Sequence, residues 1–152
     1  MTEITTGIRH EALDVAAALA AASSPDCGGI AAFVGTVRAS AAAPGRQDAE
    51  VIRLDYEAHP TLADARLSEI AEEAAAKWDL RAVLALHRTG SCALGEPTVV
   101  VVCAAPHRSD ALEACRFVID TVKTTVPIWK RELYADGSAW IGAEGAAPEA
   151  RS

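Results

Sequence analysis

The sequence has few lysines, few aromatic residues and no cysteine arrangement typical of a cross-linked or metal-bound protein. Only three of its 152 residues are lysine, and 5% are aromatic. The four cysteines form no C-x-x-C pair and no Cys/His cluster at zinc-ligand spacing, so neither a disulfide framework nor a metal site is indicated. Cys103 and Cys115 fall at apolar positions and are predicted to be buried packing residues. We expect no metal and no cofactor.

The sequence also lacks a long apolar run. Its first ten residues are polar, unlike a secretory signal peptide, and no strictly apolar run is long enough to cross a bilayer. The net charge of -7 argues against a general nucleic-acid or acidic-membrane binder, because such proteins present a broad cationic surface. We therefore expect a cytoplasmic protein that binds neither nucleic acid nor membrane.

The basic residues that are present concentrate in one segment. From His107 to Arg131 the chain carries five Lys or Arg and three acidic residues, and the remainder carries nine basic and eighteen acidic residues. Two of the three lysines, Lys123 and Lys130, lie in this segment. A small cationic site on an acidic body suits a small anionic ligand better than a polyanion; a chance fluctuation in charge order is the alternative.

Interleaved helix and strand patterns predict one α+β domain. The length fits a single domain, which we assign to residues 1–141, and the Ala-, Gly- and Pro-rich residues 142–152 are assigned to a flexible tail. Strands in hairpin-like succession favour a two-layer domain with a mainly antiparallel, mixed sheet and about three helices. Strands are expected at 1–8, 29–38, 49–58, 81–89, 97–105, 128–134 and 138–141, and helices at 11–22, 60–78 and 109–126.

The strand patterns differ in how much they predict about burial and pairing. The segment 97–105 contains four consecutive valines and is predicted to be a central strand that is covered on both faces. The 29–38 strand is predicted to be buried, and the 49–58 strand is compatible with antiparallel pairing to it. Between them, residues 39–48 contain Pro and Gly without periodicity and are predicted to be a loop.

The helix patterns predict buried faces and ends. The 11–22 helix is predicted to bury Leu13, Ala16, Ala17 and Ala20, and the 60–78 helix is predicted to bury a stripe that begins at Ala63 and Leu67. In the 109–126 helix, Asp110 and Glu113 are placed as a capping-box-like pair. Pro127 ends this helix, because the residue before a proline is pushed away from helical angles.

The two ends of the 109–126 helix carry the candidate functional residues. His107 and Arg108 lie at its entrance, where free N–H groups and the helix dipole favour an anion. Lys123 lies about 20 Å away at 1.5 Å per residue, so the two ends cannot both contact a small ligand within one chain. A turn at Pro127 can return Lys130 to the side of Lys123, and two nearby ammonium groups lower each other's pKa, which makes a lysine usable as a base or nucleophile.

Structural explanations compete with each assignment. The helix dipole alone stabilises Lys123 in a last turn, and His107 is also explained as a loop histidine bonded to a carbonyl. His59 and His87 are predicted to be structural. Arg38, at a strand end beside a loop, is either an anion contact or a solvated residue.

Several motifs in one collinear order carry a family resemblance. They are FVGTVR at 33–38, LDYEAHP at 54–60, HRTG at 87–90, APHR within 104–108, and VKTTVPIWKRE at 122–132 followed by DGSAWI. Over residues 28–141 the chain resembles the large, catalytic subunit of molybdopterin synthase, and PIWK with an upstream lysine is the most diagnostic motif.

This resemblance implies a sulfurtransferase of molybdenum-cofactor biosynthesis. Such enzymes convert cyclic pyranopterin monophosphate into molybdopterin by installing a dithiolene, and the sulfur arrives as a thiocarboxylate on the C-terminal Gly-Gly of a small ubiquitin-like carrier subunit. The resemblance further implies an α/β hammerhead-type fold and a homodimer of large subunits that forms a heterotetramer with two carriers. A non-catalytic anion-binding scaffold and a carrier-independent pterin- or nucleotide-modifying enzyme are the alternatives.

The resemblance also assigns residues. Lys123 and Lys130 match the catalytic lysines, and our hypothesis gives Lys123 acid/base or transient acyl chemistry on the carrier's terminal carbonyl while Lys130 stabilises negative charge. The sequence leaves that division of roles open. A dimer would resolve the distance problem, because His107 and Arg108 could come from the opposite subunit. The substrate-binding positions implied are Thr36, Val37, Arg38, His107, Arg108, Lys123, Lys130, Arg131 and Glu132.

Overall fold

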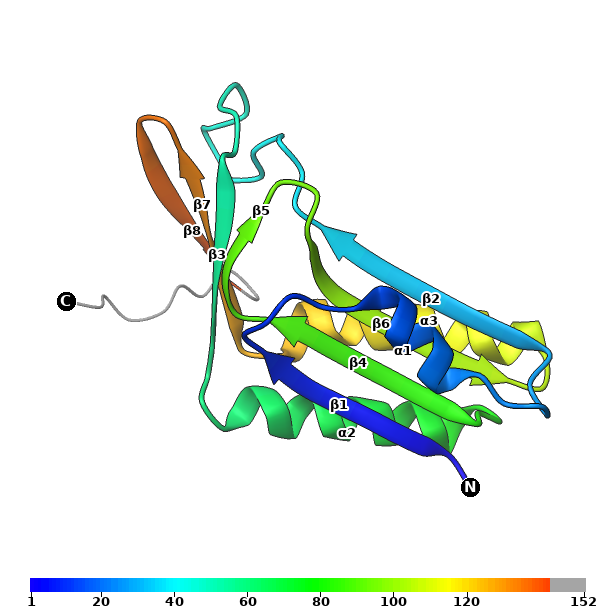
Figure 1. Ribbon diagram of the computed structural model, residues 1–152. Coiled ribbons are helices and arrows are strands. Elements are labelled where there is room, and N and C mark those ends of the chain that lie inside the picture. Colours follow the sequence, from blue (N-terminus) through cyan, green and yellow to red (C-terminus); the bar gives the residue numbers. More distant parts are fainter. Residues whose placement is uncertain (143–152) are drawn as a thin grey trace.

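The computed structural model describes residues 1–142, which form two four-stranded sheets and three helices (Figure 1). This arrangement confirms the predicted α+β class. The predicted tail, apart from its first residue, lies outside the described residues. The elements follow in the order β1 (Glu3–Arg9), α1 (Val15–Ala22), β2 (Gly29–Thr36), β3 (Arg53–Ala58), α2 (Leu62–Lys77), β4 (Ala82–Arg88), β5 (Gly90–Ala93), β6 (Pro97–Ala105), α3 (Arg108–Thr125), β7 (Ile128–Tyr134) and β8 (Gly137–Gly142).

The first sheet has the strand order β1-β4-β6-β2. β1 pairs with β4 in parallel, whereas β6 pairs antiparallel with both β4 and β2. Every residue of β6 after Pro97 is buried. The prediction of a central strand covered on both faces is therefore confirmed, and its physical basis is the run of valines, which leaves neither face polar.

Helices cover both faces of this sheet. On one face, α2 and α3 pack over alternate residues of β6 such as Val101 and Cys103, and the stripe predicted for α2 is buried there. On the other face, the short helix α1 covers Val100 and Val102. Figure 1 shows α1 in front of the sheet and α3 behind it.

The predicted buried face of the first helix is wrong. The helix begins only at Val15, because the side chain of Asp14 accepts a hydrogen bond from the N–H of Ala17 and caps it. Leu13 is buried as predicted, but within the helix Ala18 and Ala22 are the buried residues. An alanine-rich helix has little contrast between its faces, so periodicity did not identify the side that packs.

The prediction that strand 29–38 is buried is also wrong. β2 lies at the edge of its sheet and pairs with β6 alone, and its Ile30 and Phe33 are 43% and 38% exposed. The predicted pairing of the 49–58 strand with it is not formed. After Thr36 the chain crosses through residues 37–52 into the second sheet, where β3 pairs with β5 and β7.

The second sheet has the order β5-β3-β7-β8, and all its pairs are antiparallel. Figure 1 shows it standing at the end of the first sheet, beside the C-terminal end of α3. Its core contains Val37, Val51, Leu54, Tyr56, Cys92 and Tyr134. The sequence missed β5, because four residues beside a glycine turn are typical of a connection rather than a strand.

Helix α3 begins and ends close to the predicted positions, but its cap differs. His107 is the N-cap residue and makes no side-chain cap bond, so the capping box of Asp110 and Glu113 is not formed. Ser109 instead donates a hydrogen bond to Glu113. The buried residues of α3 form one stripe, Ala111, Ala114, Cys115, Val118, Ile119 and Val122, and β7 has the predicted bounds.

Two further properties follow from the sequence. Within residues 1–142, no helix is both long and apolar enough to span a membrane. Cys103 and Cys115 are buried as predicted, and burial raises the pKa of the Cys103 thiol to about 12, which makes it a packing group rather than a nucleophile.

Gly90→Ala is expected to reduce the free energy of unfolding by about 1–2 kcal/mol, because Gly90 has a φ of +86° and an L side chain is strained there. A Cβ at this position would also lie 2.8 Å from the His10 ring. Gly95→Ala is the matched control, since its φ is +80° and its surroundings are open. Denaturant unfolding of both variants separates the effect of backbone strain from the effect of the contact with His10. Equal losses of unfolding free energy in the two variants would show that the contact with His10 has no effect.

Candidate functional site

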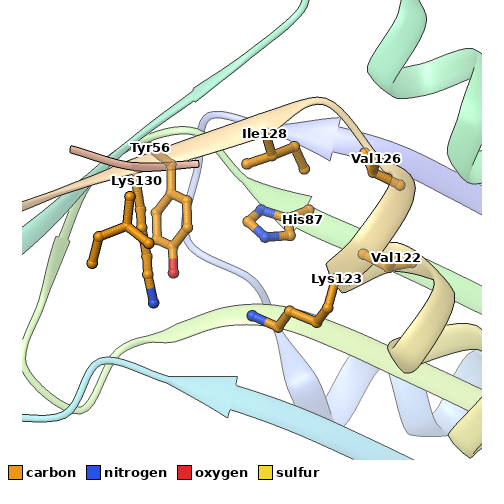
Figure 2. Close-up of a pocket in the computed structure, with 8 residues that line it drawn as sticks. Tyr56, His87, Val122, Lys123, Val126, Ile128 and Lys130 are labelled. Carbon is orange, nitrogen blue, oxygen red and sulfur yellow. The ribbon is translucent and has the colours of Figure 1, made fainter. Parts of the chain in front are cut away.

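Two adjoining cavities lie where the end of α3, the end of β2 and the strands β3 and β7 meet. Tyr56, Lys123 and Lys130 line both cavities, and Figure 2 shows them in one of the two, the inner cavity. The inner cavity has a volume of about 210 Å³, and its other lining residues are His87, Val122, Val126, Ile128 and Ile141. The outer cavity has a volume of about 340 Å³ and is also lined by Phe33, Val34, Gly35, Thr36, Arg38, Leu54, Thr98 and Glu132.

The turn at Pro127 brings the two lysines together, as the sequence predicted. Helix α3 ends at Thr125, and the N–H of Ile128 donates to the carbonyl of Val126 across a tight reversal. The strand that follows pairs with β3 so that Lys130 stands opposite Tyr56. Lys123 in the last helical turn and Lys130 in the following strand therefore point into the same space (Figure 2).

The lysines are in an environment that disfavours their charge. Burial, and then the neighbouring Lys130 ammonium, lower the pKa of Lys123. Burial and the guanidinium of Arg38 lower the pKa of Lys130, although Glu132 opposes this shift. Lys123 is an exposed residue although it lines both cavities, whereas Lys130 is half-buried. Both amines are thus more readily deprotonated than surface lysines.

Arg38 and Thr36, to which the family resemblance gives a substrate-binding role, line the outer cavity. Both are exposed residues at the end of the edge strand. Gly35 brings the β2 backbone close to β6, because a Cβ there would lie 2.7 Å from Val99 Cγ1. The outer cavity thereby gathers one guanidinium and two ammonium groups, an arrangement suited to a small anion.

Glu132 lines the outer cavity but is already bonded within the protein. Its carboxylate accepts hydrogen bonds from the N–H groups of Ala42 and Ala43, at 2.9–3.2 Å, and from the Tyr134 hydroxyl at 2.6 Å. Burial and this bond raise the pKa of Tyr134 to about 12, so its hydroxyl remains a donor. Glu132 therefore anchors the 39–48 loop that follows Arg38.

Val37 and Arg131 are not brought to either cavity. The Val37 side chain is buried in the second core, and its N–H and carbonyl bond to Glu96 and Gly95. Arg131 lies on the opposite face of β7 from Lys130, where it pairs with Asp55 at 3.0 Å. Side chains alternate between the two faces of a strand, so the residues next to Lys130 in the sequence point away from the cavities that Lys130 lines.

His107 and Arg108 lie at the other end of α3 and line neither cavity. The structure thus keeps the two ends of the helix apart within one chain, in agreement with the 18-residue length of α3. Both residues are exposed, and they lie beside the start of β2, because a Cβ added to Gly29 would lie 3.1 Å from the Arg108 Cα.

Sequence reasoning missed His87 and Tyr56 as cavity residues. Both were placed on strands, and a buried histidine or tyrosine on an apolar strand is more often structural. Their occurrence inside the HRTG and LDYEAHP motifs was the one available signal. Within residues 1–142, no group of three or more His, Cys, Asp or Glu is arranged to hold a metal.

Glu132→Ala is expected to lower the free energy of unfolding by about 2–3 kcal/mol, because two loop N–H groups and one buried hydroxyl lose a charged acceptor. Glu132→Gln, which retains an acceptor oxygen, should lose less than half as much. Asp136→Ala, which removes an exposed ion pair with Arg46, is the surface control and should be nearly neutral. Denaturant titration measures all three; a neutral Glu132→Ala would contradict the anchoring role.

The fold and these cavities define an α+β protein that presents a pair of amines of lowered pKa beside a guanidinium. The chain belongs to the MoaE family, whose model, described as MoaE protein, matches residues 8–125. This match includes Lys123 and ends five residues before Lys130.

Comparison with individual relatives agrees with this family assignment. The chain is 49% identical over 113 residues to the molybdopterin synthase catalytic subunit of Oryza sativa subsp. japonica, covering 74% of this chain and 56% of that protein. It is 36% identical over 119 residues to the human protein of the same name, covering 78% and 61%. The chain thus spans little more than half the length of these curated relatives.

Solved structures share the fold. The molybdopterin synthase structure from Staphylococcus aureus has a TM-score of 0.79 at 29% identity, covering 93% of this chain and 96% of that one. The molybdopterin biosynthesis MoaE protein from Burkholderia ambifaria MC40-6 has a TM-score of 0.75 at 34% identity, covering 98% and 94%.

Proposed function

We propose that this chain is the catalytic subunit of a molybdopterin synthase, which transfers sulfur from a thiocarboxylated carrier to cyclic pyranopterin monophosphate. The observation that carries the proposal is the placement of Lys123 and Lys130 on the shared wall of two cavities, with Arg38 in the outer one. Membership of the MoaE family supports the same reaction. Because a dithiolene contains two sulfur atoms, two thiocarboxylates are consumed for each product and each carrier leaves as a carboxylate.

The two cavities suit the two reactants. The inner cavity is small, and aliphatic residues, among them Val122, Val126 and Ile128, make up half of its lining, which fits a slim Gly-Gly terminus without side chains. The outer cavity carries Arg38 and Thr36 and fits a phosphate-bearing pterin. The lysines stand between them, where a terminal carbonyl and a pterin would meet.

Amines of lowered pKa fit the required chemistry. The lowered pKa of Lys123 makes its neutral amine more accessible than that of a surface lysine, and in that form the amine takes up a proton or attacks the carrier carbonyl, whereas an ammonium at Lys130 stabilises the oxyanion that develops there. Glu132 contributes by anchoring the loop after Arg38.

A second copy of the chain completes the site in this proposal. β2 is an edge strand with an unpaired side, and the exposed Ile30, Phe33 and Leu112 border a groove between β2 and α3. β2 begins beside Arg108 and ends at Thr36 beside the cavities. Antiparallel contact of two β2 strands about a twofold axis would therefore bring His107 and Arg108 of one copy to Arg38 of the other.

The direct test combines the purified chain with cyclic pyranopterin monophosphate and a thiocarboxylated carrier, and monitors molybdopterin. Product that depends on all three components supports the proposal. Binding of the pterin without product would indicate a non-catalytic scaffold, and turnover without the carrier would indicate a pterin-modifying enzyme; either outcome overturns the proposal. A carrier that ends in a carboxylate is the matched control, because it can dock but has no sulfur to give.

A further inference from the structure

His87 is a titratable cavity residue to which the proposed function assigns no role. It lies near the end of β4, is only 3% exposed, and lines the inner cavity. Its ring meets the Tyr56 ring edge-on, with centroids 5.0 Å apart. In Figure 2 the imidazole and the Lys123 side chain face the same space. Buried polar groups are usually hydrogen-bonded, so each nitrogen of this buried ring is expected to have a partner.

The backbone fixes the tautomer of this ring. Nδ1 of His87 lies 2.8 Å from the carbonyl oxygen of Arg88, and a carbonyl only accepts hydrogen bonds. Nδ1 therefore carries the proton and donates it, which leaves Nε2 as an acceptor with a lone pair. Within residues 1–142 this is the only hydrogen bond that the ring makes.

The carbonyl that fixes the tautomer is itself held in place. Arg88 stands opposite Arg9 in the parallel pair of β1 and β4. Its guanidinium is bonded to Glu96 and, at 3.2 Å, to the carbonyl of Ser91. The orientation of the His87 ring is therefore determined by two neighbouring strands and one turn rather than by rotation of a free side chain.

The charges around the ring keep it neutral. The titratable groups facing it are Lys123 from α3, Lys130 from β7 and Tyr56 from β3, and its strand neighbours Ile8 and Val99 are apolar. Burial, with smaller effects from the two ammonium groups, lowers the pKa of His87 to about 4, although the hydrogen bond to the Arg88 carbonyl opposes this shift. The Nε2 lone pair is thus present throughout the neutral range.

We propose that His87 is a positioning residue: its Nε2, which makes no hydrogen bond within residues 1–142, accepts one from the Lys123 amine when the lysine stem turns toward the ring in the cavity that both residues line, and so directs the amine toward the junction of the two cavities. Lysine has a flexible four-carbon stem and three donors, so without an acceptor its amine would sample both cavities. A carboxylate in this place would bind the ammonium too strongly for it to lose its proton, whereas a neutral imidazole orients it without adding charge. The catalytic importance of this hydrogen bond rests on the proposed function, but its formation does not.

Two amide variants distinguish the nitrogens of this ring. The side chain of His87→Asn reaches the position of Nδ1, so it keeps the bond to Arg88 and removes the acceptor at Nε2. His87→Gln places an amide oxygen near Nε2. We expect about a tenfold loss of turnover in the Asn variant and a loss of no more than about threefold in the Gln variant, since one hydrogen bond to a charged group is removed or kept.

The hydrogen bond itself is tested without substrate. The chain has three lysines, so Cε-labelled lysine gives three NMR signals, which Lys→Arg variants assign. An acceptor stabilises the ammonium form, so the Asn variant should titrate Lys123 at a lower pH than the wild type, while Lys130 moves less and the Gln variant stays near the wild type. A Lys123 midpoint that is the same in the folded Asn variant and the wild type overturns the proposal.

A measurement on the wild type covers the case in which the Asn variant does not fold. The chain has four histidines, and nitrogen-labelled histidine reports which ring nitrogen carries the proton. We expect His87 as the neutral Nδ1–H form between about pH 5 and pH 9; a protonated Nε2 in that range overturns the proposal. Absence of wild-type turnover with intact titrations would reject the proposed function and leave this hydrogen bond standing.

Discussion

Lys123→Met is expected to reduce molybdopterin formation by about a thousandfold or more and to leave the chain folded. Methionine keeps the length of the stem that packs beside Val122 and Val126, and it removes only the amine. General acid–base catalysis by one group contributes about 10²–10⁴-fold, and the loss of a nucleophile is at the upper end of that range. The measurement is single-turnover product formation with saturating thiocarboxylated carrier.

Lys77→Met is the matched control. Lys77 lies on α2, where its amine stacks over the Trp78 and Phe117 rings at 5.0 and 4.7 Å, away from both cavities. It should retain nearly full turnover. Turnover of the Lys123 variant within about tenfold of the control would remove Lys123 from the catalytic role.

The same variant has a defined effect on stability. The pKa of Lys123 is lower in the folded chain than in the unfolded chain, so the unfolded state binds this proton more tightly. The Lys123 ammonium therefore lowers the free energy of unfolding at pH values below the folded-state pKa. This destabilisation decreases as the pH rises toward the ordinary pKa of lysine. Lys123→Met should unfold at an equal or higher temperature than the wild type at neutral pH, and the difference should narrow toward about pH 10. A lower unfolding temperature would instead indicate that the contacts of the ammonium, including the proposed one to His87, stabilise the fold by more than its burial costs.

The sequence predicted those elements in which local pattern and burial agree. The valines of β6 leave no polar face, so a central strand is the only arrangement that buries them. The stripes of α2 and α3 contrast apolar with charged positions, and Pro127 marks where α3 must stop. These features need no knowledge of distant contacts.

Features that depend on distant partners were not predictable. β2 is as apolar as an interior strand, yet no strand pairs with its outer side in the described chain. The separation of β3 into a second sheet depends on where residues 37–52 lead, which no periodicity records. Apolar composition therefore located the strand but not its neighbours.

The residues of the candidate site likewise divide into those that local sequence features predicted and those that depend on distant contacts. Scarcity of lysine and the turn at Pro127 identified Lys123 and Lys130 as a pair. The function of Glu132 depends on the backbone N–H groups of Ala42 and Ala43, about ninety residues away in the chain, so its side chain looked like a ligand contact. His87 looked like a core residue because its cavity exists only once several separate elements meet.

Mixing two inactive variants is expected to restore about a quarter of wild-type turnover if the site is shared between two copies. Lys123→Met removes the amine from one side of the proposed site, and Arg108→Ala removes the guanidinium that the other copy supplies. In an equal mixture, about half of the twofold dimers contain one chain of each kind. Each such dimer has one site with both residues intact and one site with neither, which gives the quarter.

The matched control combines Lys123→Met with Lys130→Met. Both lysines line the same cavities of one chain, so a mixed dimer has one lysine missing from each site and no intact site. That mixture should stay as inactive as its components. For the Lys123→Met and Arg108→Ala pair, the two chains are refolded together with different affinity tags, and purification on both tags isolates the mixed dimer, which should reach about half of wild-type turnover.

The outcome decides whether one substrate contacts Arg108 and Lys123 from two different chains or contacts the cavities of a single chain alone. Its length separates Arg108 from Lys123 within one chain, so a small substrate contacts both only across two chains. If the mixture of Lys123→Met and Arg108→Ala gives no more product than the two variants measured separately, Arg108 does not complete a site in trans. The two cavities of one chain would then be sufficient by themselves, with Arg38 as the guanidinium that holds the phosphate.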